Sequence, residues 1–228
     1  MFVQLLTHTP DPERVVAAAA RLCYSDSSID ELMGRETAEQ KKLLRKILGL
    51  GHFSVLEHAS FSFGVEGISR ACSHQLVRHR LASYSQQSQR YVSHAERFDA
   101  VTPPTIADKP ELEAKYNGLL EEIHRHYREL MEAGIPAEDA RFVLPNAATT
   151  KIVITMNARE LKHFFNLRCC RRAQWEIQIM AKQMLKLARK AAPLLFATAG
   201  PGCLEGPCPE GKMTCGEIQA VRQEFSDL

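Results

Sequence analysis

Residues 59–66, ASFSFGVE, alternate strictly between apolar and small or polar side chains. Phe61, Phe63 and Val65 therefore share one side of the chain, which is the period-2 pattern of a strand with one buried face. The β-branched run TKIVITM at 150–156 is a second strand pattern, and MFVQLL at the N-terminus is a third. Because these strands do not alternate regularly with helices, their order argues against a doubly wound parallel sheet.

Helical periodicity fills most of the chain between the strands. Asp11 followed by Pro12 predicts one helix start, and Pro110 predicts another. Thr37 and Asn157 each precede Gln or Glu by three residues, which is the pattern of a capping box. We also expect helices at 68–80 and at about 172–192, and a polar loop at 81–91. The chain is thus predicted to be α/β, of the α+β type.

Composition and charge exclude several classes of function. The chain is 45% hydrophobic and 25% charged, as in a protein with a real core. A net charge of +2 creates no global field that would attract nucleic acid or an anionic membrane. No apolar run approaches the roughly 20 residues of a membrane span, and MFVQLLTHTPDPER does not resemble a secretory leader. We therefore expect a cytoplasmic protein with neither a nucleic-acid nor a membrane partner. No glycine-rich fingerprint follows a strand, so a Rossmann domain or P-loop is not expected.

Of the seven cysteines, Cys23, Cys72, Cys169 and Cys170 lie in or next to predicted helices and are expected to be free thiols in a reducing cytosol. Cys203, Cys208 and Cys215 follow one another as C-x4-C-x6-C in a Gly- and Pro-rich segment. Three such residues suit zinc if a fourth ligand comes from elsewhere, although the tight C-x2-C spacing is absent. We assign no metal and leave that alternative open.

The stretch QLVRHRLASYSQQSQRY, from Gln75 to Tyr91, is the most informative for function. On the predicted helix, Gln75, Arg78 and His79 share one face. The following loop is made almost entirely of hydroxyl and amide side chains and ends at Arg90. Arginine forks suit phosphate, and hydroxyls and amides satisfy further polar groups, so the stretch predicts a site for a phosphorylated ligand such as a nucleotide. The alternative is a solvated basic helix end with a polar loop.

The same stretch resembles the signature of the flavin-dependent thymidylate synthases. Arg78-His79-Arg80 is followed by seven residues and then Ser88, as in that family. Three further blocks occur in the family's order: GHFSVLEH (51–58), ARFVLP (140–145) and NARELKHFFNLRCCRRAQWEI (157–177). The resemblance spans about residues 1–197, which predicts one domain at 1–198 and a C-terminal tail at 199–228.

The resemblance implies a mixed, largely antiparallel sheet packed with long helices, as in the thymidylate synthase-complementing protein fold. It also implies the reductive methylation of dUMP to dTMP, as a step of dTMP biosynthesis, with 5,10-methylenetetrahydrofolate as carbon donor. NADPH would be the reductant and FAD the cofactor. The reduced flavin would supply the hydride, so no cysteine nucleophile is needed. A homotetramer with shared active sites is implied as well.

Residue roles follow from the resemblance position by position. Arg168 would lie against the uracil and polarise it as the catalytic residue, and His52 would line the nicotinamide or folate side of the flavin. Position 86, often Glu in the family, is Gln here, and position 163, often Asn, is His. FAD would contact Ser54, Arg78, His79, Arg80, Gln86, Asn157, Arg159 and His163. The residues that would hold dUMP are Gln75, Arg78, Gln86, Ser88, Arg90, Arg141 and Arg168.

Other interpretations of these residues remain. Ser88 lacks a GxSxG elbow, so it is assigned to phosphate rather than to nucleophilic attack. Cys169 and Cys170 adjoin Arg168, and a thiolate there is the alternative to packed helix thiols. For the chain as a whole, the rival functions are an RNA- or nucleotide-binding module and a flavoprotein that transfers no methyl group.

Overall fold

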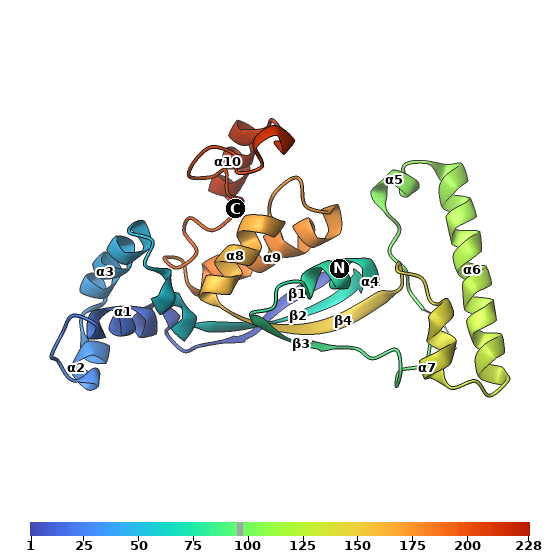
Figure 1. The fold of residues 1–228 in the computed structure, drawn as a ribbon, viewed down its shortest axis with the longest axis horizontal. Coiled ribbons are helices and arrows are strands. Elements are labelled where there is room, and N and C mark those ends of the chain that lie inside the picture. The colour runs from blue at the N-terminus through green and yellow to red at the C-terminus, as the bar shows by residue number, and fades with distance from the viewer. Residues whose placement is uncertain (95–97) are drawn as a thin grey trace. The chain divides into compact units, whose positions relative to one another are not determined.

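The computed structural model describes residues 1–94 and 98–228. It is about 52% helical with a four-stranded antiparallel sheet, which confirms the α+β class. The strands are β1 (Phe2–His8), β2 (Ser60–Ser69), β3 (Ala82–Gln86) and β4 (Thr149–Asn157). Their order in the sheet is β1-β2-β4-β3, so β1 and β3 are its edges (Figure 1).

Ten α-helices and three short 3-10 helices make up the other regular elements of the described residues. The α-helices are α1 (Pro12–Leu22), α2 (Ile29–Gly34), α3 (Thr37–Gly49), α4 (Arg70–Leu76), α5 (Pro104–Ala107), α6 (Pro110–Glu132), α7 (Ala137–Ala140), α8 (Ala158–Arg168), α9 (Trp175–Ala191) and α10 (Ile218–Asp227). Short 3-10 helices are η1 (Phe53–His58), η2 (Arg141–Val143) and η3 (Gly211–Met213). None of the helices described is long and apolar enough to cross a membrane.

The chain divides into two compact units, each built from separated segments. Unit 1 comprises Met1–Phe2, Val65–Arg78 and Tyr84–Val153. Unit 2 comprises Val3–Gly64, His79–Ser83 and Ile154–Leu228. The expected boundary at residue 198 stays a prediction.

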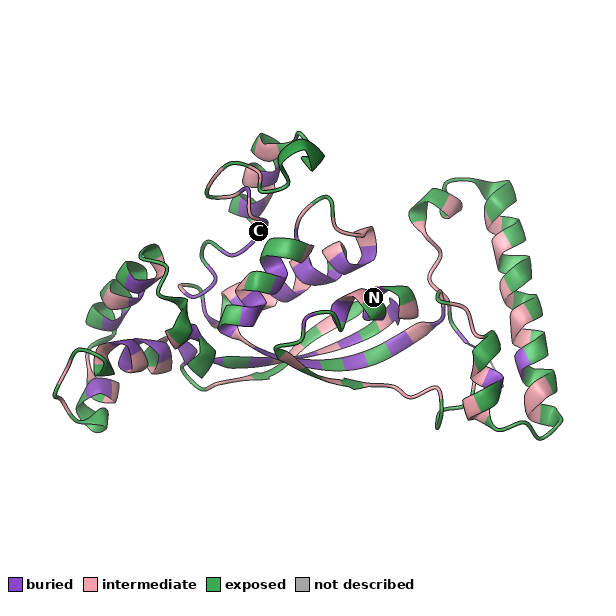
Figure 2. Ribbon diagram, viewed as in Figure 1, coloured by how far each residue is buried: buried purple, intermediate pink, exposed green. Residues whose placement is uncertain are grey.

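The core of unit 2 is aromatic. Phe61 is completely buried, which confirms that it lies on the predicted buried face of its strand. Its ring centroid lies 5.2 Å from that of Phe196 in an edge-to-face contact. Phe165 on α8 meets the same Phe196 ring at 5.9 Å, and such pairs add to the stabilisation from apolar burial. Figure 2 shows the matching burial: α8 has purple and green residues, and α9 is mostly purple and pink. The core therefore fixes α8, the helix that carries two of the predicted flavin residues, Arg159 and His163.

Two predicted helix starts are right in position but wrong in their caps. Asp11 occupies the N-cap of α1 with a φ of 44°, and its side chain makes no capping hydrogen bond. At α3 the N-cap is Glu36 rather than Thr37, again without a side-chain cap. The capping box in this region belongs instead to α2, where Ser28 and Glu31 bond reciprocally.

Unit 1 contains the long helix α6, most of whose surface is exposed (Figure 2). Tyr127 is its one buried residue, and the Tyr127 hydroxyl accepts a hydrogen bond from the backbone N–H of His94. Tyr116 donates to the carbonyl of Val101 at 2.9 Å. The helix ends at Glu132, and Gly134 follows with a φ of 81°, as its position after the helix predicts.

The helix predicted at 68–80 is much shorter in the structure. Ile68 and Ser69 belong to β2, and the Ser69 side chain caps α4 by accepting from the N–H of Cys72. The helix α4 ends at Leu76, so Gln75, Arg78 and His79 do not share a helical face. The predicted loop at 81–91 is also partly wrong, because β3 forms within it as an edge strand beside β4.

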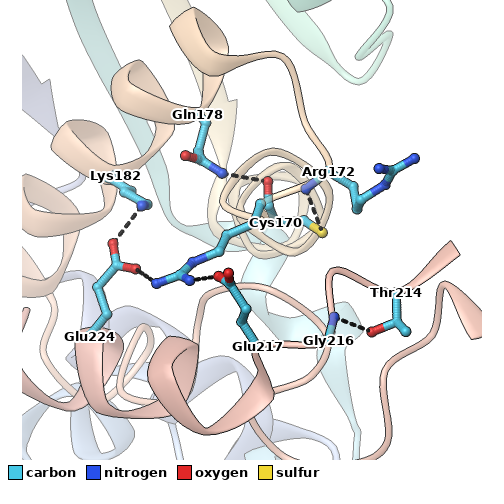
Figure 3. Close-up of polar contacts among 9 residues, drawn as sticks. Cys170, Arg172, Gln178, Lys182, Thr214, Gly216, Glu217 and Glu224 are labelled. Carbon is cyan, nitrogen blue, oxygen red and sulfur yellow. Dashed lines mark hydrogen bonds and ion pairs between the residues drawn. The ribbon is translucent and has the colours of Figure 1, made fainter.

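The C-terminal segment contains a helix that its Gly- and Pro-rich start did not predict. Val221 and Phe225 of α10 are buried in unit 2, and Glu224 bonds both Lys182 of α9 and Arg171 (Figure 3). Arg189 donates to the carbonyls of Phe196, Ala199 and Phe225. These contacts hold α10 in unit 2.

Candidate functional site

His79 is the centre of a buried hydrogen-bond chain in unit 2. Only 5% of its surface is exposed. Its Nδ1 lies 3.1 Å from Oε1 of Glu160, and its Nε2 accepts a hydrogen bond of 3.0 Å from Nε of Arg168. The Phe164 ring packs edge-to-face against the imidazole, with 5.0 Å between the ring centroids.

These two contacts define the tautomer of His79. A guanidinium has donors only, so Nε2 of His79 must present its lone pair to Arg168. The proton of the neutral ring is then on Nδ1, where it donates to the Glu160 carboxylate. Burial is the largest cause that lowers the pKa of His79, the hydrogen bond that His79 donates to Glu160 opposes it, and the charge of Arg168 lowers the pKa further. The net shift is downward, so the imidazole is neutral at physiological pH.

The helix α8 carries both ends of this chain. Asn157 caps it by accepting from the backbone N–H of Glu160, as the sequence predicts. Glu160, however, is buried, and its carboxylate bonds His79 rather than the cap residue. Arg168 is the last residue of the same helix. Because Glu160 and Arg168 lie on the same helix, α8 fixes the spacing between the backbone positions of the carboxylate and the guanidinium.

The first turns of α8 also carry exposed donors. Arg159 and His163 are four residues apart, so they are neighbours on one face of the helix. The His163 ring lies 5.8 Å from that of His79, and Arg159 pairs with Glu57 of η1. Because that ion pair is about half exposed, exchanging it for a phosphate costs little. Also in unit 2, Ser54 lies on η1, Arg80 is exposed and His52 is the exposed N-cap of η1.

In unit 1, two predicted phosphate-binding arginines converge on one residue. Nε of Arg90 donates to the Glu138 carboxylate, and Nε of Arg141 donates to the Glu138 backbone carbonyl at 3.0 Å. Arg70 is close enough for the charge of Arg141, after burial, to lower the pKa of its guanidinium. Arg90 and Arg141 thus meet at Glu138, and Arg70 lies near Arg141, which gives a local group of cations that suits a phosphate dianion.

The remaining predicted residues of unit 1 are amides, a hydroxyl and an arginine. Gln86 donates from Nε2 to the Thr150 hydroxyl at 3.2 Å, which links β3 to β4. The Ser88 hydroxyl accepts from the backbone N–H of Arg90. Gln75 is half-buried on α4, and Arg78 is exposed two residues after that helix ends.

The cysteines beside Arg168 differ sharply in environment. Cys169 is buried, and burial raises its pKa to about 12, which favours the protonated thiol over a reactive thiolate. Cys170 is half-buried, and its sulfur accepts from the backbone N–H of Arg172 (Figure 3). Within residues 1–94 and 98–228, no three His, Cys, Asp or Glu side chains are arranged to hold a metal ion.

The sequence missed three residues that shape these clusters. The sequence predicts Glu160 as a capping residue, and only the structure shows that its carboxylate bonds His79. Thr150 belongs to an ordinary strand pattern, and Glu138 to an acidic helix start. The local sequence around these three residues does not predict their roles, because each side chain contacts a residue that is far away in the sequence.

Fold and site together define a class: an α+β protein with a guanidinium oriented by a buried imidazole in one unit and a cluster of arginines in the other. The sequence profile of the family described as thymidylate synthase complementing protein matches residues 4–194. The chain therefore belongs to the thymidylate synthase complementing protein family.

Two relatives are similar in sequence over nearly the whole length of this chain. A flavin-dependent thymidylate synthase from Geobacter sulfurreducens is 57% identical, over 100% of this chain and 99% of its own. One from Clostridium tetani is 45% identical, over 98% and 96%. Among solved structures, a UMP/dUMP methylase from Streptomyces cacaoi bound with 5-Br dUMP has a TM-score of 0.72 at 26% identity, covering 86% of this chain and 93% of its own.

Proposed function

We propose that this chain is an FAD-dependent thymidylate synthase. It methylates dUMP to dTMP, with 5,10-methylenetetrahydrofolate as carbon donor and NADPH as reductant, and so supplies dTMP biosynthesis. The observation that carries the proposal is the position of Arg168. The guanidinium expected to polarise the uracil is bonded to His79, the central residue of the family's Arg-His-Arg motif.

The donor set suits dUMP. Arg90 and Arg141 already meet at Glu138, and the exposed ion pair of Arg90 with that carboxylate is weak enough to yield to a phosphate. Gln75, Arg78, Gln86 and Ser88 provide additional charged and neutral polar groups for the nucleotide. Arg168 would then donate to the uracil and stabilise negative charge that develops on the ring.

The donor set also suits FAD. Asn157 is the N-cap of α8, and Arg159 and His163 lie in its first turns, where the helix N-terminus adds its own partial positive charge. By the family resemblance, FAD would also contact Ser54, Arg78, His79, Arg80 and Gln86. When bound, FAD supplies the hydride chemistry, which removes the need for a cysteine nucleophile. This fits the protonated, buried thiol of Cys169.

We further propose a cytoplasmic homotetramer with shared active sites. Several large apolar side chains are exposed in the chain, among them Tyr91 and Phe142 of unit 1, at 78% and 82%. Such exposure is typical of surfaces that other subunits cover. Light scattering after size-exclusion chromatography should give a mass about four times the 25.6 kDa of one chain.

The direct test of the function is turnover. Purified protein with FAD, dUMP, methylenetetrahydrofolate and NADPH should form dTMP, and omission of any one should stop it. NADPH oxidation that continues without dTMP formation would point to a flavoprotein that transfers no methyl group. Salt-sensitive RNA binding without flavin uptake would point to a nucleic-acid-binding module.

A further inference from the structure

Glu160 has no role in the function proposed above, yet it is one of the few buried carboxylates of unit 2. Its side chain is 7% exposed and lies 3.1 Å from Nδ1 of a buried imidazole. The cap of α8 does not need this carboxylate, because Asn157 bonds the backbone N–H of Glu160. A buried charge is costly unless it is hydrogen-bonded, so its contact with His79 calls for an explanation.

We infer that Glu160 is a positioning residue that orients Arg168 through His79. The inference rests on the proposed role of Arg168 and adds to it a residue that acts without touching the substrate. The Glu160 carboxylate accepts a hydrogen bond from Nδ1–H of His79. Nε2 of the neutral ring is therefore left with a lone pair, which accepts a hydrogen bond from Nε of Arg168.

The geometry of the guanidinium explains why the hydrogen bond from Arg168 to His79 matters for substrate binding. A hydrogen bond at Nε fixes the plane of the fork, and with it the directions of the two terminal Nη groups. Arg168 is the last helical residue of α8, where the backbone alone restrains a long side chain poorly. The planar guanidinium must donate to both a uracil carbonyl and a ring nitrogen, so dUMP binds more tightly if the orientation of the guanidinium is fixed beforehand.

The opposite tautomer shows what Glu160 prevents. If the ring proton were on Nε2, that N–H would face the N–H of Arg168, and the two donors would repel each other. The carboxylate makes this tautomer unfavourable, because it would face the lone pair of Nδ1. Glu160 therefore selects the one neutral form of His79 that can hold Arg168.

Two substitutions separate positioning from mere packing. Glu160→Leu removes the acceptor and leaves the backbone cap of α8 intact. Glu160→Gln keeps the shape and one acceptor oxygen, so it is the matched rescue variant. We expect Glu160→Leu to weaken dUMP binding about tenfold, as the loss of a buried hydrogen bond warrants, while FAD binding changes less. For Glu160→Gln we expect dUMP binding within about threefold of the unmodified protein, since its oxygen can still accept from Nδ1.

The deciding readout is the His79 tautomer, measured by ¹⁵N NMR of the histidine-labelled full chain and assigned with His79→Gln. We expect the proton on Nδ1 in the unmodified protein and in Glu160→Gln, and a mixture of tautomers in Glu160→Leu. A proton on Nε2 in the unmodified protein would overturn the inference. So would unchanged dUMP binding in Glu160→Leu.

The tautomer experiment does not depend on FAD or dUMP. A protein that binds neither ligand would contradict the proposed function, while the tautomer would still decide the role of Glu160. Thermal midpoints of both variants show whether a loss of binding reflects unfolding. If Glu160→Leu does not fold, the tautomer of the unmodified protein and of Glu160→Gln still decides the question.

Discussion

Nε of Arg168 donates a hydrogen bond of 3.0 Å to Nε2 of His79, although 89 positions separate the two residues in the sequence. This bond joins the residue expected to polarise the uracil to the residue at the centre of the family's Arg-His-Arg motif. It requires a neutral imidazole, because a protonated ring has no lone pair left to accept.

The first prediction concerns the guanidinium itself. Arg168→Ala should lower methylation about 10²- to 10³-fold, because it removes a donor aimed at charge that develops in the transition state. Bound FAD should be retained, since the predicted flavin contacts lie on other residues. Single-turnover rates and flavin absorbance measure the two effects. Loss of FAD together with activity would contradict the assigned role.

A matched variant refines that prediction. Arg168→Lys keeps the positive charge but lacks the Nε–H that His79 accepts and the planar fork. It should therefore resemble Arg168→Ala in rate rather than the unmodified protein. Full activity in Arg168→Lys would show that charge alone is sufficient.

The second prediction concerns acid. The pKa of His79 is lowered in the folded protein, first by burial, against an unfolded value of 6.5. Between these two pKa values the unfolded chain binds the proton and the folded chain does not, so stability is full above about pH 6.5 and falls as the pH drops through this window. His94, whose pKa is lowered by burial and by His124, adds to the same trend.

Denaturant midpoints at pH 7.5 and 5.5 measure the effect. The groups that face His79 are Glu160, Arg168 and His163, and the protonated ring would meet the charge of Arg168. His79→Asn should lose less stability between the two pH values than the unmodified protein. An equal loss in both would assign the acid sensitivity to other groups.

The third prediction concerns the thiol next to Arg168. Cys169→Ala should leave the methylation rate within about threefold, because a thiol with a pKa of about 12 supplies no nucleophile near neutrality. Stability should fall by about 1–2 kcal/mol, as for the loss of a small buried group. Cys169 should also resist alkylation in the folded protein, whereas the exposed Cys23 reacts. Abolished methylation in a folded Cys169→Ala protein would revive the thiolate alternative.

The fourth prediction concerns the C-terminal helix. Arg189 donates to three backbone carbonyls, including that of Phe225 in α10. Arg189→Leu should lower the free energy of unfolding by about 2–4 kcal/mol, since buried acceptors lose their donors. Limited proteolysis should then release residues from α10 first. Unchanged protection of α10 would show that its apolar contacts are sufficient.

The sequence predicts the parts of the fold that depend on local patterns. Phe61, Phe63 and Val65 alternate because β2 has one buried face, and Asn157 marks the start of α8 because its side chain fits an N-cap. The segment around Arg78, His79 and Arg80 was predicted as helix from its neighbours. Contacts of His79 with residues 81 and 89 positions away prevail over that local preference.

Two further differences between the sequence prediction and the structure also arise from contacts that are distant in the sequence. The strand β3 is polar because it is an edge strand, so the apolar alternation that identifies β2 is missing. The helix α10 follows a Gly- and Pro-rich stretch, and its buried Val221 and Phe225 become recognisable only once α9 provides a surface. The site residues came from ordered family motifs, whereas Glu160 required the fold.

The most direct test of the central claim is the visible spectrum of the purified protein, followed by titration with dUMP. We predict a yellow protein whose flavin absorbance shifts as dUMP binds, because both ligands share one active site in the proposed reaction. A colourless protein that also fails to take up added FAD would contradict the account.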